Sequence, residues 1–204
     1  MARNRGVGVA GSVRVLALVA LASVLHTGCD TQEAPASAGT AVPQYNPETG
    51  RLERITFDRD GDGRPDAWLF MQGTLVERAE LDENGDGEVD RWEYYDTTAA
   101  QSRGTDGLPR GTLLRAESST RYDGVISRRE RYENGLLVAV EEDTSGDGRP
   151  DKWETWADGS LQSISLDTTG SGRPDRRIVY NADGTPRLLV DRDGNGIFEP
   201  DPAP

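Results

Sequence analysis

Short segments rich in Asp and Gly recur along the chain, and their oxygen-bearing side chains are spaced for metal coordination. The clearest segment spans residues 82–93. Its oxygen donors fall at positions 1, 3, 5, 7, 9 and 12, counted from its first Asp: Asp82, Asn84, Asp86, Glu88 (through its main-chain carbonyl), Asp90 and Glu93. Calcium prefers about six to eight hard oxygen ligands, and a short loop can turn several of them toward one point. The segment therefore predicts a calcium site.

This spacing resembles the calcium-binding loop of EF-hand proteins, which has Gly at position 6 and a bidentate Glu at position 12. Gly87 and Glu93 stand at those positions. Dockerin modules and thrombospondin type 3 repeats have similar Asp spacing, but dockerins, like EF-hands, use flanking helices, and thrombospondin repeats normally carry disulfides. The resemblance implies calcium as the ligand and is confined to the loops, because the flanks of this segment alternate as strands do.

Four other segments carry weaker versions of the pattern. Segment 143–154 offers Asp143, Ser145, Asp147, Arg149 (main-chain carbonyl), Asp151 and Glu154, although Pro150 at position 8 lacks the N–H that joins paired EF-hand loops. Segment 58–69 offers Asp58, Asp60, Asp62 and Asp66, with Leu69 at position 12. Segment 167–178 has lost more donors, since Ser171 is at position 5 and Ile178 at position 12. The last segment offers Asp191, Asp193, Asn195 and Glu199, with Pro202 at position 12.

The same residues have a second interpretation. Asp, Asn and Gly are also the residues of ordinary tight turns, so the segments could be metal-free corners. Crowded carboxylates repel one another and destabilise a fold, and Arg64, Arg149 and Arg173 neutralise only part of that charge. A divalent cation would neutralise the rest.

The Asp segments belong to a repeat with a period of 24 residues. Segments start at Asp58, Asp82, Asp143, Asp167 and Asp191, and the three adjacent steps are each 24 residues. The remaining step is 61 residues, which is two periods plus 13. A degenerate copy begins at Ser119, and the extra residues fall in 96–111, which we interpret as an inserted surface loop.

The segments between the Asp loops alternate with period two, as half-buried strands do. Before the first loop, apolar Ile55 and Phe57 alternate with Arg54 and Thr56. A second Gly turn closes each unit, with Asn-Gly and Asp-Gly pairs that favour type I′ hairpins: Asn134-Gly135, Asp158-Gly159 and Asp183-Gly184. The predicted fold is all-β, with tandem hairpin repeats of about 24 residues forming an antiparallel meander. The aromatic residues that follow the loops are expected to form its core: Trp68, Phe70, Trp92, Tyr94, Tyr95, Trp153, Trp156 and Tyr180.

The N-terminus has the features of an export signal. Arg3, Arg5 and Arg14 precede an uncharged apolar run of 11 residues, Val15 to Leu25, which is too short to span a bilayer. The sequence that ends at Cys29 resembles the lipobox of bacterial lipoproteins, which implies cleavage before Cys29 and its lipidation; the alternative is an ordinary secretory signal. We therefore predict a signal peptide (1–28), a flexible tether (29–44), a repeat domain (45–200) and a tail (201–204).

Composition excludes several kinds of site. After cleavage the chain would have 20 Lys and Arg against 36 Asp and Glu, a net charge of −16 that repels nucleic acid and attracts cations. Its one His, His26, precedes the cleavage point, and Cys29 is its one Cys. Catalysis by a Ser-His-Asp or Cys-His arrangement, a His/Cys zinc site and an internal disulfide are thus excluded from the mature chain.

These observations predict a non-catalytic, calcium-binding lipoprotein of the cell envelope, anchored to the membrane only through lipid. Calcium would stabilise a repeat scaffold or interaction surface whose protein or cell-wall partner the sequence does not identify. One alternative is a metal-independent structural or adhesive repeat protein. Another is a polysaccharide hydrolase that uses two carboxylates, although no pair among the many Asp and Glu residues stands out.

Overall fold

The computed structural model describes residues 40–98, 102–104 and 107–201, which lie in one compact unit. The prediction of an all-β fold is confirmed, because every regular element in the described residues is a strand. The strands are β1 (Thr40–Tyr45), β2 (Leu52–Asp58), β3 (Ala67–Gln72), β4 (Leu75–Leu81), β5 (Arg91–Asp96), β6 (Ser102–Arg103), β7 (Pro109–Arg110), β8 (Thr112–Ser118), β9 (Arg128–Glu133), β10 (Leu136–Glu142), β11 (Lys152–Ala157), β12 (Ser160–Leu166), β13 (Arg176–Tyr180), β14 (Pro186–Val190) and β15 (Glu199–Pro200).

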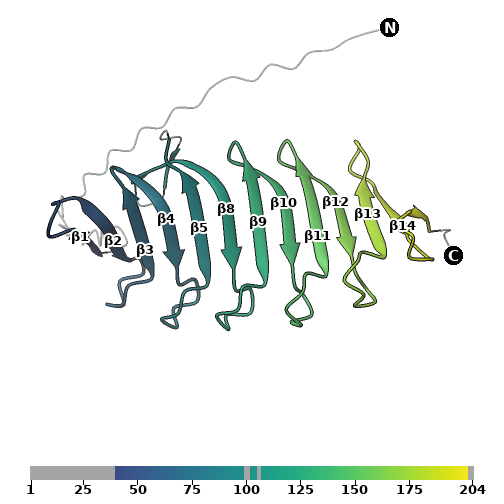
Figure 1. Ribbon diagram of the computed structural model, residues 1–204, viewed down its shortest axis with the longest axis horizontal. Helices are drawn as coiled ribbons and strands as arrows, with labels where there is room; N and C mark the ends of the chain where they lie inside the picture. Colours follow the sequence, from purple (N-terminus) through teal and green to yellow (C-terminus); the bar gives the residue numbers. More distant parts are fainter. Residues whose placement is uncertain (1–39, 99–101, 105–106, 202–204) are drawn as a thin grey trace, which may run out of the picture. The chain divides into compact units, whose positions relative to one another are not determined.

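The strands form one antiparallel meander, as the repeat predicts. Each strand from β1 to β5 and from β8 to β15 pairs with its neighbours in the chain, and β5 pairs with β8 across the insertion. Because the strands alternate in direction, all Asp loops lie along one edge of the sheet and the Gly turns along the other (Figure 1). The insertion adds the short β6–β7 pair, and β7 makes one parallel bridge to β4, between Arg110 and Val76.

The 24-residue period is visible in the irregularities of the sheet. Five antiparallel strand pairs contain a bulge at which one residue has no cross-strand partner: Glu53, Glu77, Leu114, Val138 and Gln162. Successive bulges are 24 residues apart except for Glu77 and Leu114, which are 37 apart, or one period plus 13. The sheet thus places the 13 extra residues where the sequence predicts the insertion.

Two of the predicted Gly turns have the backbone that a type I′ hairpin requires. Asn134 and Gly135 have φ of 53° and 77°, and Asp158 and Gly159 have 50° and 74°. The third predicted pair differs, since in Asp183-Gly184 only the glycine has positive φ. There the turn is longer and is closed by a hydrogen bond from the Asn181 N–H to the Thr185 carbonyl.

The sheet buries few apolar side chains, and these lie on one face, which we call the core face. Its central cluster consists of Ile55, Leu69, Val76 and Ala79, and Leu108 of the insertion packs against it. Among the described residues, seven hydrophobic side chains are buried against ten polar or charged ones. Packing alone is therefore a weak source of stability for this sheet, and the buried polar groups need partners.

The expectation that the aromatic residues form the core is wrong for most of them. Trp68, Trp92 and Trp153 are only half-buried and lie on the opposite face. There Glu80 is the cross-strand partner of both Trp68 and Trp92, and Glu141 is that of Trp153. Phe70 and Tyr94 share this face and stack with arginines from neighbouring strands, at 4.0 Å for Arg78 and 3.6 Å for Arg115. The reason is parity: each of these three Trp residues stands one residue from a core-face position, so its side chain points to the other side of the sheet.

The repeat sheet starts earlier than the sequence predicts. Residues 40–44, assigned above to the tether, belong to β1, which pairs with β2 from Thr40 opposite Asp58 to Tyr45 opposite Leu52. A proline is disfavoured in a central strand, but Pro43 is tolerated because β1 is the first strand of the sheet and pairs with β2 alone. The predicted signal peptide, Cys29, most of the tether and Pro202 lie outside the described residues. The described residues include no helix that is long and apolar enough to cross a membrane.

Candidate metal centres

The Asp loops share one hydrogen-bonded frame built around their first residue. Both carboxylate oxygens of Asp82 accept backbone N–H groups, from Gly85 and Gly87 at 2.7 Å each. Both glycines have positive φ, 78° and 96°, which few other residues adopt without strain. The first aspartates of three other loops accept the same pair of bonds from positions 4 and 6: Asp58, Asp143 and Asp191. In the remaining loop, Asp167 accepts N–H groups from Thr169, Ser171 and Gly172 instead.

In every loop but the last, the ninth residue closes the loop and joins it to the next. The carboxylate of Asp90 accepts the backbone N–H of Glu83 at position 2, and Asp66 and Asp151 accept the equivalent bond. The carbonyl of that ninth residue then accepts the N–H of the first residue in the following loop, as in the 2.7 Å bond from Ser119 to Asp90. Five such bonds link the six loops along the sheet edge. The buried Asp66, Asp82, Asp90, Asp143 and Asp191 therefore all have partners.

The side chains at positions 3 and 5 curl over the loop and are exposed. Asn84 accepts the N–H of Asp86, and Asp86 accepts the N–H of Glu88, at 2.9 and 2.8 Å. The same pattern recurs at Asp60 and Asp62, at Asp193 and Asn195, and between Asp147 and Arg149. Ser145 differs, since its hydroxyl donates to Asp143. Each carboxylate oxygen has two lone-pair sites, so the frame leaves acceptor capacity for an ion.

Loop 58–66 brings three carboxylates to one point. Ligand oxygens of Asp58, Asp60 and Asp66 lie within 4.8 Å of one another, and within the described ranges this is the one such group of His, Cys, Asp or Glu side chains. Two oxygens bound to the same Ca²⁺ at its usual distances are at most about 5 Å apart. These three residues thus fit a calcium ion, and this loop, third by its sequence pattern, is the most convergent. Asp62 is not part of the group.

The glutamates at position 12 do not turn back toward their loops. Glu93 lies on the core face of β5, where it accepts hydrogen bonds from Arg91 at 3.0 Å and from the Tyr95 hydroxyl. Glu154 is held in the same way by Lys152 and Trp156 on β11, at 2.8 and 3.0 Å. Glu199, the position 9 residue of the last loop, is also on a strand, exposed on β15 opposite Val190. The structure therefore brings positions 1, 3 and 9 together in loop 58–66, and it places the glutamates at position 12 of loops 82–93 and 143–154 on the sheet.

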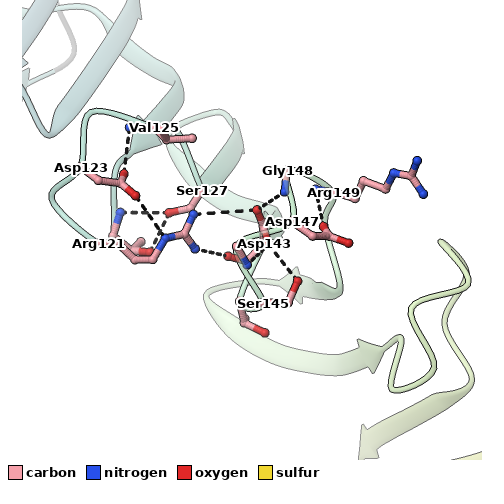
Figure 2. A network of polar contacts seen from close by, with 12 residues as sticks. Arg121, Asp123, Val125, Ser127, Asp143, Ser145, Asp147, Gly148 and Arg149 are labelled. Atoms are coloured by element: carbon pink, nitrogen blue, oxygen red, sulfur yellow. Dashed lines mark hydrogen bonds and ion pairs between the residues drawn. The ribbon is translucent and has the colours of Figure 1, made fainter.

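The degenerate loop 119–127 keeps the frame with serines in place of aspartates. The buried Ser119 accepts the Asp123 N–H, and the buried Ser127 accepts the Thr120 N–H, both through their hydroxyls. Asp123 in turn accepts the Val125 N–H at 2.9 Å (Figure 2). Neutral hydroxyls thus close this corner without the carboxylates that a calcium site needs.

Two arginines, which the sequence patterns did not single out, reach from one loop to the next. Arg59 binds Asp66 of its own loop at 2.8 Å and donates to the main-chain carbonyl of Asp82 at 3.1 Å. Arg121 pairs with Asp123 and donates to the main-chain carbonyl of Asp143 at 3.0 Å (Figure 2). The sequence holds one signal for them, which is a basic residue at position 2 or 3 of a loop. Arg192 is the one other basic residue at these positions in the six loops.

The loop frame favours ionised carboxylates. Burial alone would raise the pKa of Asp143, but the N–H groups of Gly146 and Gly148 and the nearby Arg121 lower it below its ordinary value. Asn84 and the Glu88 N–H lower the pKa of Asp86. Desolvation opposes the effect at Asp167 too, yet the Gly172 N–H and its neighbours lower that pKa to about 2. At neutral pH these loops present full negative charge at the sheet edge.

Comparison with known proteins leaves the family open. No protein-family model and no curated protein matches the chain. One similar solved structure is the GtfA/B complex bound to UDP and GlcNAc, with 19% identity and a TM-score of 0.35 over 57% of this chain and 22% of that chain. Another is accessory secretory protein 1, 2 and 3 in Streptococcus pneumoniae, with 13% identity and a TM-score of 0.31 over 65% of this chain and 20% of that chain. The chain spans about a fifth of the length of each, and likenesses this weak carry no argument about function.

Proposed function

We propose that this protein is a non-catalytic, calcium-binding repeat protein of the cell envelope, in which calcium stabilises the loop edge of a thin sheet. The convergence of Asp58, Asp60 and Asp66 carries the proposal. The shared frame extends it to the loops that begin at Asp82, Asp143 and Asp191. Positions 1, 3, 5 and 9 and the carbonyl at position 7 would supply the ligands, with water in place of the glutamate at position 12.

The direct test is thermal unfolding of the purified protein with calcium or with a chelator. An ion that binds the folded state alone raises the melting temperature, and calorimetric titration gives the number of ions. Asp60→Asn keeps the acceptor for the Asp62 N–H but removes one charge, so it should weaken calcium binding in loop 58–66. Asp183→Asn removes a charge at the opposite edge and serves as the matched control. An equal melting temperature with and without calcium would refute the proposal.

A metal-independent structural role is the second candidate, and one observation favours it. The buried aspartates at positions 1 and 9 already accept backbone N–H groups, so hydrogen bonds alone close the loops. The two candidates predict different effects on stability when carboxylate charge is removed from a loop. If the loops are only turns, replacing both Asp60 and Asp62 by Asn should leave stability nearly unchanged in calcium as well as in chelator.

The envelope part of the proposal rests on the sequence around Cys29, outside the described residues. Lipidation at this residue would tether the repeat sheet to a membrane while leaving its loops in an extracytoplasmic, calcium-containing space. Metabolic labelling with palmitate should mark the protein in a bacterial host. Cys29→Ser should abolish the label, and a label that persists in this variant would refute lipidation at Cys29.

A further inference from the structure

Arg59, at position 2 of its loop, and Arg121, at position 3, make the same kind of contact with the following loop. Each starts in one Asp loop and donates to the main-chain carbonyl of the first Asp in the next loop, Asp82 or Asp143. Those two loops have the most complete calcium pattern in the sequence. The same two residues also make the backbone hydrogen bonds that join the loops: the Asp82 N–H donates to the Asp66 carbonyl, and the Asp143 N–H donates to the Ser127 carbonyl.

Each guanidinium also lies beside a carboxylate that a calcium ion would use. Arg59 pairs with Asp66 at 2.8 Å, and Asp66 belongs to the convergent group of loop 58–66. A terminal nitrogen of Arg121 lies 3.9 Å from a carboxylate oxygen of Asp143. Arg121 is also packed on the next loop, since a methyl group at Gly146 would lie 3.5 Å from its guanidinium carbon. By contrast, the Arg149 side chain points away from this network (Figure 2).

We propose that Arg59 and Arg121 are resident cations that stabilise the loop edge when calcium is absent and compete with calcium when it is present. This inference rests on the proposed calcium binding. A fixed positive charge beside Asp66 or Asp143 relieves carboxylate repulsion in the empty loop, and the same charge repels an incoming Ca²⁺. The arginines would therefore set the calcium concentration at which these loops fill, while keeping the sheet folded below it.

The test compares Arg59→Gln and Arg121→Gln with the unaltered protein, in chelator and in saturating calcium. Each Gln variant should melt about 2–8 °C lower in chelator, because it loses charged hydrogen bonds to the next loop. The loss should be smaller in calcium, so the calcium-induced rise in melting temperature becomes larger. Titration should show at least a threefold gain in calcium affinity.

Two controls separate charge from packing. Arg121→Lys retains the positive charge and should restore a calcium affinity close to that of the unaltered protein. Arg173→Gln removes an exposed guanidinium from another loop and should leave both melting temperatures nearly unchanged. A purely structural role would lower stability equally with and without calcium.

The outcomes distinguish this inference from the proposal on which it rests. If calcium never shifts the melting temperature of the unaltered protein, calcium binding itself is refuted. If calcium shifts it but Arg59→Gln and Arg121→Gln leave the size of that shift and the affinity unchanged, the role of the two arginines is refuted while calcium binding stands.

Discussion

At the scale of single residues, neighbours on the strand decide what a glutamate at position 12 does. Glu93 matches a calcium ligand by type and spacing, yet Arg91 and Tyr95 stand two residues away on either side. In a strand these three side chains point to the same face, so the Arg91 guanidinium and the Tyr95 hydroxyl both donate hydrogen bonds to the Glu93 carboxylate. The carboxylate is therefore held on the strand and not at the loop. The arrangement recurs on β11, where Lys152 and Trp156 stand two residues before and after Glu154 and bind its carboxylate.

Glu93→Gln tests this assignment. We expect the number of bound calcium ions to stay the same, because the side chain faces the sheet and not the loop. Stability should fall by about 1 kcal/mol, the usual loss for a weakened charged hydrogen bond, measured by urea unfolding in chelator. The loss of one ion in a calorimetric titration would show instead that Glu93 is a ligand.

At the scale of the strands, charged side chains form a continuous chain of ion pairs across the core face. Going from β5 to β11, its members are Glu93, Arg91, Glu130, Arg128, Glu142, Lys152 and Glu154, with neighbouring pairs between 2.8 and 3.2 Å apart. Arg91 reaches Glu130 over β8 because Ala116 and Ser118 there are small. These pairs are largely shielded from solvent, so they supplement the few apolar side chains, Ala116 and Val140, that are buried in the middle of the sheet.

Arg128→Gln should therefore destabilise the protein more than a surface change does. Arg128 holds Glu130 at 2.8 Å and Glu142 at 3.1 Å, and its loss leaves two shielded carboxylates with one partner fewer each. We expect a loss of about 1–3 kcal/mol in urea unfolding. Arg131→Gln, on the same strand, breaks an exposed pair with Glu133 and should cost about 0.5 kcal/mol or less. Equal losses in the two variants would argue against the chain of ion pairs.

How much of this could be predicted from sequence differs between elements. The 24-residue period, the strands and the Asp loops follow from spacing and alternation, which are local properties. The face of Trp68, the orientation of Glu93 and the reach of Arg121 depend on the strand or loop alongside, which one strand's sequence does not specify. The start of β1 is not evident from the sequence, because Thr40–Tyr45 contains Pro43 and few apolar residues, and the strand pairs with β2 alone.

At the scale of the whole molecule, each unit pairs with its neighbours in the chain, as in other repeat proteins. Deleting residues 143–166 removes one whole period and joins Glu142 to the Asp loop that starts at Asp167. Arg176 would then face Glu142 where Lys152 stood, since both basic residues are 10 positions beyond the end of the preceding strand. We expect a folded protein with a lower melting temperature, measured by circular dichroism.

Deleting only half a unit, residues 143–154, is the control for this experiment. It joins β10 to the remainder of β11 without a turn, so the following strands lose their direction in the meander. The half-unit variant should not unfold cooperatively. If both deletions behave alike, the 24-residue unit is not the unit of folding.

Stability of the calcium-free molecule should decrease in acid. The folded state lowers the pKa of Asp143, Asp151, Asp167 and Glu130 below their ordinary values. Such groups stabilise the fold fully above their unfolded pKa, at about pH 5, and lose that contribution as pH falls through the folded values, down to about 2 for Asp167. Melting temperatures in chelator at pH 7, 4 and 2.5 should decrease in that order, and a constant value would contradict the hydrogen-bonded frame.

The outermost strands of the meander, β1 and β15, each contain a proline, and this affects how the sheet can pair with other molecules. An open sheet offers unpaired backbone groups at each end, which can recruit strands from other molecules and begin fibrous aggregation. Pro43 in β1 and Pro200 in the two-residue β15 each lack an N–H, so neither end presents a full row of donors. Backbone pairing of one copy with another is thereby discouraged at both ends of the described sheet.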